Sequence, residues 1–172
     1  TSTIEQPSPH LEVRRLGRQP YAEVHELQTR LVERRIAGEF GDQLVLCEHD
    51  PIYTAGRGTG IESLGDPPVE VLEVERGGEA TYHGPGQLVA YPILALEGEP
   101  RDLHRYLRDL EEVVIRMLAE VEVVGTRRPG LTGVWVGERK ICSVGVAVRR
   151  WVTFHGFAVN IATDLAAFEV FR

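Results

Sequence analysis

The residues best suited to chemistry in this 172-residue chain form a glycine-rich segment, residues 76–87. It reads Arg-Gly-Gly-Glu-Ala-Thr-Tyr-His-Gly-Pro-Gly-Gln and leads directly into the apolar run at residues 88–93. Glycines and a proline around a Thr-Tyr-His centre predict a sharply turning backbone that can approach a ligand closely. Because long irregular loops inside compact domains tend to be functional, we expect a ligand to bind against this loop.

Lys140 is a second candidate, because it begins a strongly apolar segment rather than standing among other charges. A lysine at such a place often extends its ammonium group to solvent. Partial burial would instead lower its pKa and make it a proton donor or acceptor near neutral pH. Cys142, two residues on, is expected on the same face of the strand at about 7 Å. That separation is too long for direct activation, so the sequence favours a packed core thiol for Cys142.

Histidine and arginine beside glycine mark further candidates. His83 and His155 each precede a glycine where an apolar strand begins or is interrupted. One such pair is often structural, but two indicate a cleft in which imidazole and backbone approach a ligand. Arg57, in the glycine-rich loop at residues 49–60, either belongs to a surface turn or reaches over the site. The spacing of histidines, cysteines and acidic residues predicts no metal site.

The elements that must position these side chains are mixed along the chain. Apolar runs predict strands at residues 11–16, 43–48, 69–74, 88–94, 133–136, 139–148 and 152–161. Helical spacing predicts helices between residues 20 and 38 and between residues 100 and 125, and Asp164 is a typical N-cap. This order lacks regular alternation of strands and helices. It favours an α+β fold, a mixed sheet with packed helices.

Two details of these elements are specific expectations. The second helix should bury one apolar stripe, made of Leu103, Tyr106, Leu110, Val113, Met117 and Val121. Pro92 lacks a backbone N–H, so its strand should lie at the edge of a sheet or carry a bulge.

Composition limits the class of protein. With 42% hydrophobic and 26% charged residues, the chain is typical of one globular domain, residues 1–172. A formal charge of −7 argues against a nucleic-acid surface, although several arginine doublets could face one acidic partner. Cys47 and Cys142 stand inside apolar runs and predict buried free thiols in a reducing compartment. The first ten residues lack an export signal and no apolar run approaches about 18 residues, so we expect a cytoplasmic protein without a membrane segment.

Blocks of sequence in consecutive order resemble the lipoyl (octanoyl) transferases of lipoate synthesis. They are Leu-Cys-Glu-His-Asp-Pro at 46–51, Tyr-Thr-Ala-Gly-Arg at 53–57, the whole of 76–87, Gly-Val-Trp-Val at 133–136, Lys-Ile-Cys-Ser-Val-Gly-Val at 140–146 and Phe-His-Gly-Phe-Ala-Val-Asn at 154–160. The string at 76–87 is the most specific of them. The chain is identified as a member of this family.

The resemblance implies a fold like that of biotin and lipoate protein ligases and an acyltransferase that needs no cofactor. It implies transfer of an octanoyl group from octanoyl-acyl carrier protein to a lysine of a lipoyl domain, such as those of 2-oxoacid dehydrogenases and the glycine cleavage H protein. It also implies a cysteine thioester intermediate, with Lys140 stabilising the thiolate and handling protons.

By position, the resemblance assigns three segments to the acyl and pantetheine site. They comprise Arg76, Gly77, Gly78, Glu79, Ala80, Thr81, Tyr82, His83, Ser143, Val144, Gly145, Gly156, Phe157 and Ala158. The family nucleophile lies in a Pro-Cys-Gly segment, and aligning Phe168 places that cysteine just beyond Arg172. We therefore expect the C-terminal end of the domain to be missing from these residues, and we do not expect Cys142 to replace the nucleophile.

Two alternative functions stay open. An ATP-dependent lipoate or biotin ligase shares the implied fold, although the His-Gly-Pro-Gly-Gln string at residues 83–87 fits the transferases better. A non-catalytic module that binds acyl carrier protein or lipoyl domains would not need the nucleophile.

Overall fold

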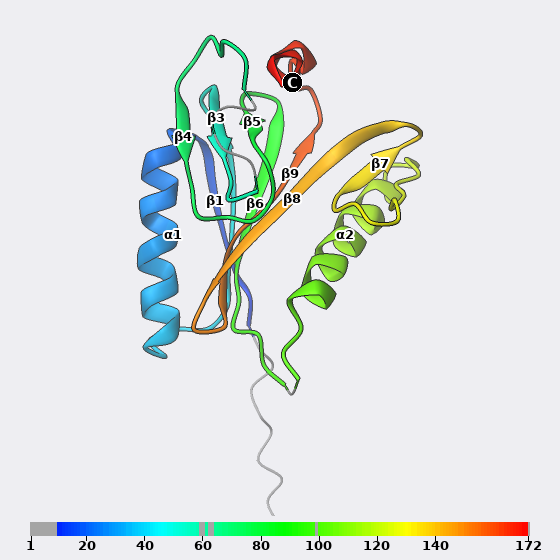
Figure 1. Ribbon diagram of the computed structural model, residues 1–172. Coiled ribbons are helices and arrows are strands. Elements are labelled where there is room, and N and C mark those ends of the chain that lie inside the picture. The colour runs from blue at the N-terminus through cyan, green and yellow to red at the C-terminus, as the bar shows by residue number, and fades with distance from the viewer. Residues whose placement is uncertain (1–9, 59–60, 62–63, 99, 172) are drawn as a thin grey trace, which may run out of the picture.

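The computed structural model describes residues 10–58, 61, 64–98 and 100–171, and it contains two β-sheets with two helices packed on the larger sheet (Figure 1). The polar lead at residues 1–9, the loop positions Thr59 and Gly60, and Arg172 lie outside the described residues. The α+β class expected from the sequence is confirmed.

Six strands form the larger sheet in the order β1-β2-β6-β9-β8-β7, and three form the smaller sheet in the order β4-β3-β5. The strands are β1 (Glu12–Gln19), β2 (Gln43–His49), β3 (Ile52–Ala55), β4 (Val71–Glu73), β5 (Thr81–His83), β6 (Gln87–Ile93), β7 (Val134–Val136), β8 (Arg139–Arg149) and β9 (Val152–Asn160). The pairs β1–β2 and β3–β4 are parallel, and the others described are antiparallel. The sheets are therefore mixed, as predicted.

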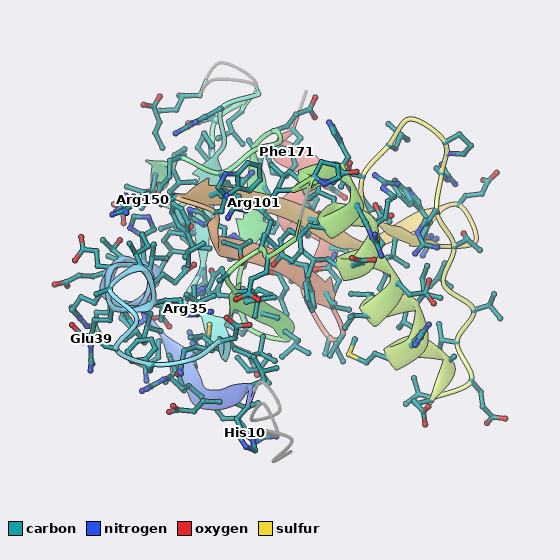
Figure 2. The ribbon with its side chains drawn as sticks, turned by 90° about the horizontal axis from the view of Figure 1, so that it is seen from below. His10, Arg35, Glu39, Arg101, Arg150 and Phe171 are labelled. Carbon is teal, nitrogen blue, oxygen red and sulfur yellow. The ribbon has the colours of Figure 1, made fainter. Side chains whose placement is uncertain are left out.

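Two helices, α1 (Tyr21–Ile36) and α2 (Leu103–Ala119), cover opposite faces of the larger sheet (Figure 1). Figure 2 shows the same arrangement from below, with the sheet between the two helices. Alternating residues of β9 explain it, because Phe154 belongs to the core under α1 and Phe157 to the core under α2. Neither of these helices combines the length and the hydropathy required to cross a membrane. A short 3₁₀ helix, η2 (Leu165–Val170), follows β9.

The apolar stripe of α2 differs from the predicted one. Asp102 caps the helix as its side chain accepts a hydrogen bond from the Arg105 N–H at 3.1 Å. The buried apolar side chains are spaced four residues apart, at Tyr106, Leu110, Val114 and Leu118. Val113 and Val121 are 54% and 67% exposed, so their predicted burial is wrong. The helix packs on the sheet through this row of residues spaced four apart. Both valines lie outside the row.

Pro92 lies in the interior of the larger sheet, so an edge position is wrong. β6 pairs with β2 through Pro92, opposite Leu44, but pairs with β9 only as far as Ala90, opposite Phe157. The Pro92 carbonyl faces β9 and accepts a hydrogen bond from Thr153 Oγ1 at 2.8 Å. The missing N–H of Pro92 therefore falls where the β6–β9 ladder is already interrupted. A proline is tolerated there because no ladder hydrogen bond is lost.

A bend in β9 causes this interruption. His155 has a φ of +54°, and the adjacent Gly156 has a φ of +159°. A Cβ atom at Gly156 would collide with the Ala90 carbonyl oxygen and lie 2.7 Å from Pro92 Cδ. β9 stays paired with β8 across these two residues, so the predicted interruption of the strand is a bend and not a break.

Substitution of Gly156 by alanine should destabilise the fold, because the added methyl group meets backbone that cannot move aside. We expect a loss of about 1–3 kcal/mol in the free energy of unfolding, measured by urea denaturation. Gly41→Ala is the control, since a Cβ atom there would make only an ordinary contact, 3.5 Å from the His10 carbonyl oxygen. Equal stability of the two variants would contradict this explanation of the bend.

Candidate active site

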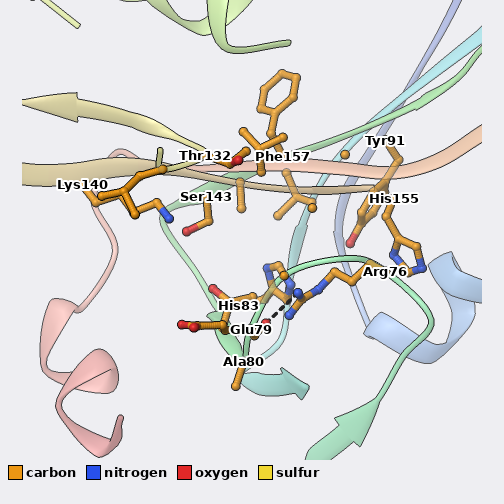
Figure 3. A pocket seen from close by; sticks show the side chains of 18 of the residues that line it. Arg76, Glu79, Ala80, His83, Tyr91, Thr132, Lys140, Ser143, His155 and Phe157 are labelled. Carbon is orange, nitrogen blue, oxygen red and sulfur yellow. Dashed lines mark hydrogen bonds between the residues drawn. The ribbon is translucent and has the colours of Figure 1, made fainter. Parts of the chain in front are cut away.

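A cavity of about 360 Å³ lies between the glycine-rich loop and strands β8 and β9 (Figure 3). Its volume is in the range of small-molecule sites, roughly 300–1,000 Å³. Figure 3 shows Glu79 and His83 on the loop side and Lys140 and Ser143 on the β8 side. His155 also lines the cavity, so the cleft that the two His-Gly pairs and Lys140 predicted is present.

Most of the predicted binding residues line this cavity. They are Arg76, Gly78, Glu79, Ala80, Thr81, His83, Ser143, Val144, Gly145, Gly156, Phe157 and Ala158. Gly77 and Tyr82 lie off the wall: the Gly77 N–H donates to the Val146 carbonyl at 2.9 Å, and the Tyr82 ring centroid lies 5.2 Å from that of Tyr53. Successive strand residues point to opposite faces, so Tyr82 must point away when its neighbours point into the cavity.

Arg76 fixes the start of the glycine-rich loop. Its side chain is 7% exposed, and its Nη2 donates to the Thr54 carbonyl at 2.8 Å and to Thr54 Oγ1 at 2.9 Å. Its Nη1 donates to the carbonyls of Glu79 at 2.7 Å and Gly77 at 3.1 Å. The guanidinium group thus binds the loop to β3, and its part in the cavity is to hold the wall in shape.

Gln87 fixes the other end of the loop. Its Oε1 pairs with His83 Nδ1 at 2.8 Å, while its Nε2 donates to the Tyr82 carbonyl and to Asn160 Oδ1, each at 3.0 Å. The Gly86 N–H donates to Glu48 Oε2 at 2.9 Å. Both ends of the loop are therefore anchored by side chains, which leaves the glycines between them to define the cavity wall.

The histidines beside the cavity are uncharged. Burial lowers the pKa of His83 to about 3, and the hydrogen bond to Gln87 Oε1 assigns the proton to Nδ1. Burial also lowers the pKa of His49, whose ring bonds to the Gln19 carbonyl at 3.0 Å and to the Tyr91 hydroxyl at 2.7 Å. These hydrogen bonds make His49 a structural residue at the end of β2 and leave the floor of the cavity without a positive imidazole.

Two glycines let the loop and the strands meet closely. A Cβ atom at Gly145 would lie 2.7 Å from the Gly77 carbonyl oxygen. A Cβ atom at Gly133 would lie 2.5 Å from Lys140 Cε. The first glycine allows the loop to rest on β8, and the second makes room for the stem of the lysine.

Lys140 lies at the cavity wall and is the second residue of strand β8. Its Nζ lies 5.3 Å from the centre of the Trp135 ring, and the guanidinium carbon of Arg128 lies 5.5 Å from the same ring. The residue reaches solvent, yet protein atoms crowd its inner side, and this desolvation lowers the pKa of Lys140. The ammonium group is thus biased toward proton donation, as expected for a partly buried lysine.

Cys142 does not share the face of Lys140, so that expectation is wrong. Val134 pairs with Cys142 and Trp135 with Lys140, which places a bulge in β8 between the two residues. One extra residue reverses the alternation of side chains beyond it. Cys142 is fully buried in the core under α2, and burial raises the pKa of its thiol to about 12. The structure confirms a packed core thiol.

Several cavity residues were not assigned to the site from the sequence. Tyr21 at the start of α1, Tyr91 on β6 and Trp135 on β7 resemble ordinary core residues, and residues 130–132 resemble a surface turn. Arg57 is exposed and lies outside the cavity wall, which supports the surface-turn interpretation. The packing of α1 on the sheet and the pairing of β7 with β8 bring these residues to the cavity.

The class of protein follows from comparison of fold and sequence. The profile of the lipoyl protein ligase A/B catalytic domain matches residues 20–172. A lipoate protein ligase from Thermoplasma acidophilum, described with its E2 lipoyl domain, has a similar structure, with a TM-score of 0.71 over 95% of this chain and 67% of that chain. At 21% sequence identity this likeness shows the fold alone.

Sequence relatives define the family more closely. The octanoyltransferase of Rubrobacter xylanophilus is 52% identical over 176 residues, covering 96% of this chain and 79% of the relative. The octanoyltransferase of Syntrophotalea carbinolica is 50% identical over 159 residues, covering 92% of this chain and 75% of the relative. The chain belongs to the octanoyltransferase family, as its sequence blocks indicated.

Acid should destabilise the protein through His83. The unfolded imidazole, with a pKa near 6.5, takes up a proton that the folded state resists until about pH 3. Stability is therefore lost as the pH falls through this window, by about 1.4 kcal/mol per pH unit. Urea unfolding between pH 6 and pH 4 should show a smaller loss for His83→Gln than for the wild type, whereas exposed His104→Gln should match the wild type. Identical slopes for all three would contradict a buried neutral His83.

Proposed function

We propose that this protein transfers an octanoyl group from octanoyl-acyl carrier protein to a lysine of a lipoyl domain. The observation that carries the proposal is Lys140, which lies at the wall of a cavity in a chain whose relatives are octanoyltransferases. Lipoyl domains of 2-oxoacid dehydrogenases and the glycine cleavage H protein are the acceptors that the family resemblance implies.

The cavity suits an acyl chain attached to a polar carrier. Val89, Val144 and Phe157 give it apolar walls, and Gly78 and Gly145 leave its interior open. His83 is uncharged and therefore adds no further buried charge beside the hydrocarbon. We place the acyl chain along these walls and the thioester near Lys140.

The proposed reaction passes through a cysteine thioester. The thiolate attacks the octanoyl carbonyl carbon, a new C–S bond forms, and the pantetheine sulfur leaves with a proton from Lys140. The acceptor lysine then attacks this thioester, an amide bond forms, and the enzyme sulfur leaves as thiolate while Lys140 takes up the amine proton. Lys140 is the catalytic residue of this chain in both halves of the reaction.

We assign the attacking sulfur to the cysteine that the family resemblance places just beyond Arg172. Cys47 and Cys142 are poor nucleophiles, because both are buried and burial raises the pKa of each thiol to about 12. The ring of Phe168 in η2 lies 5.7 Å from that of Tyr82 in β5. A cysteine that follows η2 would therefore start beside the glycine-rich loop.

Basic residues at the cavity mouth support an acidic carrier as partner. Lys140 and Arg128 both lie over the Trp135 ring, and Arg139 is exposed next to them. The doublet at residues 34–35 is instead bound in ion pairs, with Glu39 at 2.6 Å and Asp42 at 2.9 Å. We propose docking of acyl carrier protein at the Trp135 mouth and, from the two free thiols, a cytoplasmic location.

The proposed transfer predicts a covalent octanoyl adduct on the full-length protein. Incubation with octanoyl-acyl carrier protein should add one octanoyl mass in intact mass spectrometry, and a lipoyl domain should then remove it. Turnover with ATP and free octanoate, without the carrier, would instead identify a ligase. Binding of the carrier with neither adduct nor transfer would identify a non-catalytic module.

Replacement of Lys140 by alanine should lower the rate of octanoyl transfer roughly 10²–10⁴-fold, because proton transfer is lost. Lys140→Arg should not restore the rate, since a guanidinium keeps its proton at neutral pH. Arg30→Ala is the control, because this exposed residue of α1 lies outside the cavity wall and takes no part in the proposed docking surface. Near-normal single-turnover transfer by Lys140→Ala would rule out the proton-transfer role.

A further inference from the structure

Three possible metal ligands meet behind the cavity although they are far apart in the sequence. His25 comes from α1, Glu75 follows β4, and His155 comes from the bend in β9. One ligand atom from each side chain lies within 4.8 Å of the other two. The spacing of these residues along the chain gave no sign of the cluster, which only the fold assembles.

The separation between His155 and Glu75 fits a shared metal ion better than a hydrogen bond. His25 Nε2 lies 3.1 Å from Glu75 Oε1, and His155 Nε2 lies 3.6 Å from the same oxygen. Ligands bonded to zinc at about 2.0–2.2 Å with tetrahedral angles are roughly 3.3–3.6 Å apart. The 3.6 Å separation falls in that range and is too long for a hydrogen bond, whereas the 3.1 Å separation is the hydrogen bond between His25 Nε2 and Glu75.

His155 gives an independent indication of a ligand. It is 1% exposed, and among the described residues neither of its ring nitrogens has a hydrogen-bond partner. A buried imidazole without partners is costly, and bonding to a cation through Nε2 would satisfy the nitrogen that faces Glu75. A hydrogen bond between His25 and Glu75 alone leaves this nitrogen unexplained.

The surroundings hold the three side chains in place. The His155 ring stacks on Phe154 at 5.1 Å between centroids. The backbone N–H of His155 donates to Gln28 Oε1 of α1 at 2.7 Å. Figure 3 shows the guanidinium end of Arg76 directed toward Glu79 and away from His155. The guanidinium of Arg76 thus does not point into the cluster.

We propose that His25, Glu75 and His155 form a binding site for one divalent transition-metal ion of the zinc type. Two imidazole nitrogens and one carboxylate select such an ion over Mg²⁺ or Ca²⁺, which prefer oxygen ligands. The side chains of His25 and Glu75 are each 28% exposed, so water can supply a fourth ligand. The ion ties α1 and β9 to the residue that precedes Arg76, and so positions the rear wall of the cavity. This inference is independent of octanoyl transfer.

The test uses full-length protein freed of metal with a chelator. Calorimetric titration with ZnCl₂ should give one ion per chain, and Co²⁺ should give the visible absorption of a four-coordinate complex. Zinc should also raise the melting temperature of the wild type, whereas MgCl₂ should not. Loss of zinc binding and of the cobalt spectrum is expected for His25→Ala and for Glu75→Gln. His104→Ala, which removes an exposed histidine from α2, should retain both.

Two results would overturn the proposal. One is the absence of saturable zinc binding by folded wild-type protein, which would leave only a hydrogen-bonded cluster. The other is unchanged zinc affinity in His25→Ala and Glu75→Gln, which would place the ion elsewhere. Circular dichroism of each variant confirms folding, and Glu75→Gln serves alone if His25→Ala does not fold.

Discussion

The buried guanidinium of Arg76 is the constraint on which the cavity depends. Arg76 is 7% exposed, and its Nη1 and Nη2 donate to carbonyls of its own loop and to both oxygens of Thr54 on β3, whereas its Nε has no partner among the described residues. Loss of those acceptors would leave an unpaired buried charge, at a cost of several kcal/mol. The glycine-rich loop is therefore held in one conformation, and the smaller sheet is fastened to the cavity wall by the same group.

Charge is distributed unevenly across the site. The interior combines the hydrogen-bonded guanidinium of Arg76 with neutral polar groups, since burial lowers the pKa of His83 and raises the pKa of the Tyr91 hydroxyl. The mouth carries Lys140 and Arg128, both of which lie over the ring of Trp135. In the proposed reaction, a hydrocarbon chain would lie inside, and proton transfer and recognition of an acidic partner would take place at the rim.

Features with a local cause were accessible from the sequence. The turns of the glycine-rich loop, the N-cap at Asp164 and the place of Lys140 near the start of a strand depend on residues close together in the chain. Predictions were wrong where the orientation or position of a residue depends on a contact with a segment far away in the sequence. A bulge against β7 turned Cys142 away from Lys140, and the bend in β9 gave Pro92 a place inside the sheet. The sequence predicted an interruption at His155 and Gly156, but neither the bulge in β8 nor the effect of the bend on Pro92 follows from the pattern of one strand.

The sequence by itself determined the family, the α+β class and the loop that shapes the cavity, because steric demands of glycine and proline and apolar periodicity act over a few residues. Only the tertiary structure decided which face Cys142 takes, that Tyr21 and Trp135 reach the cavity, and that His25, Glu75 and His155 meet. Those outcomes depend on strand register and on how α1 docks against β9. These are contacts between residues far apart in the chain, which local pattern does not encode.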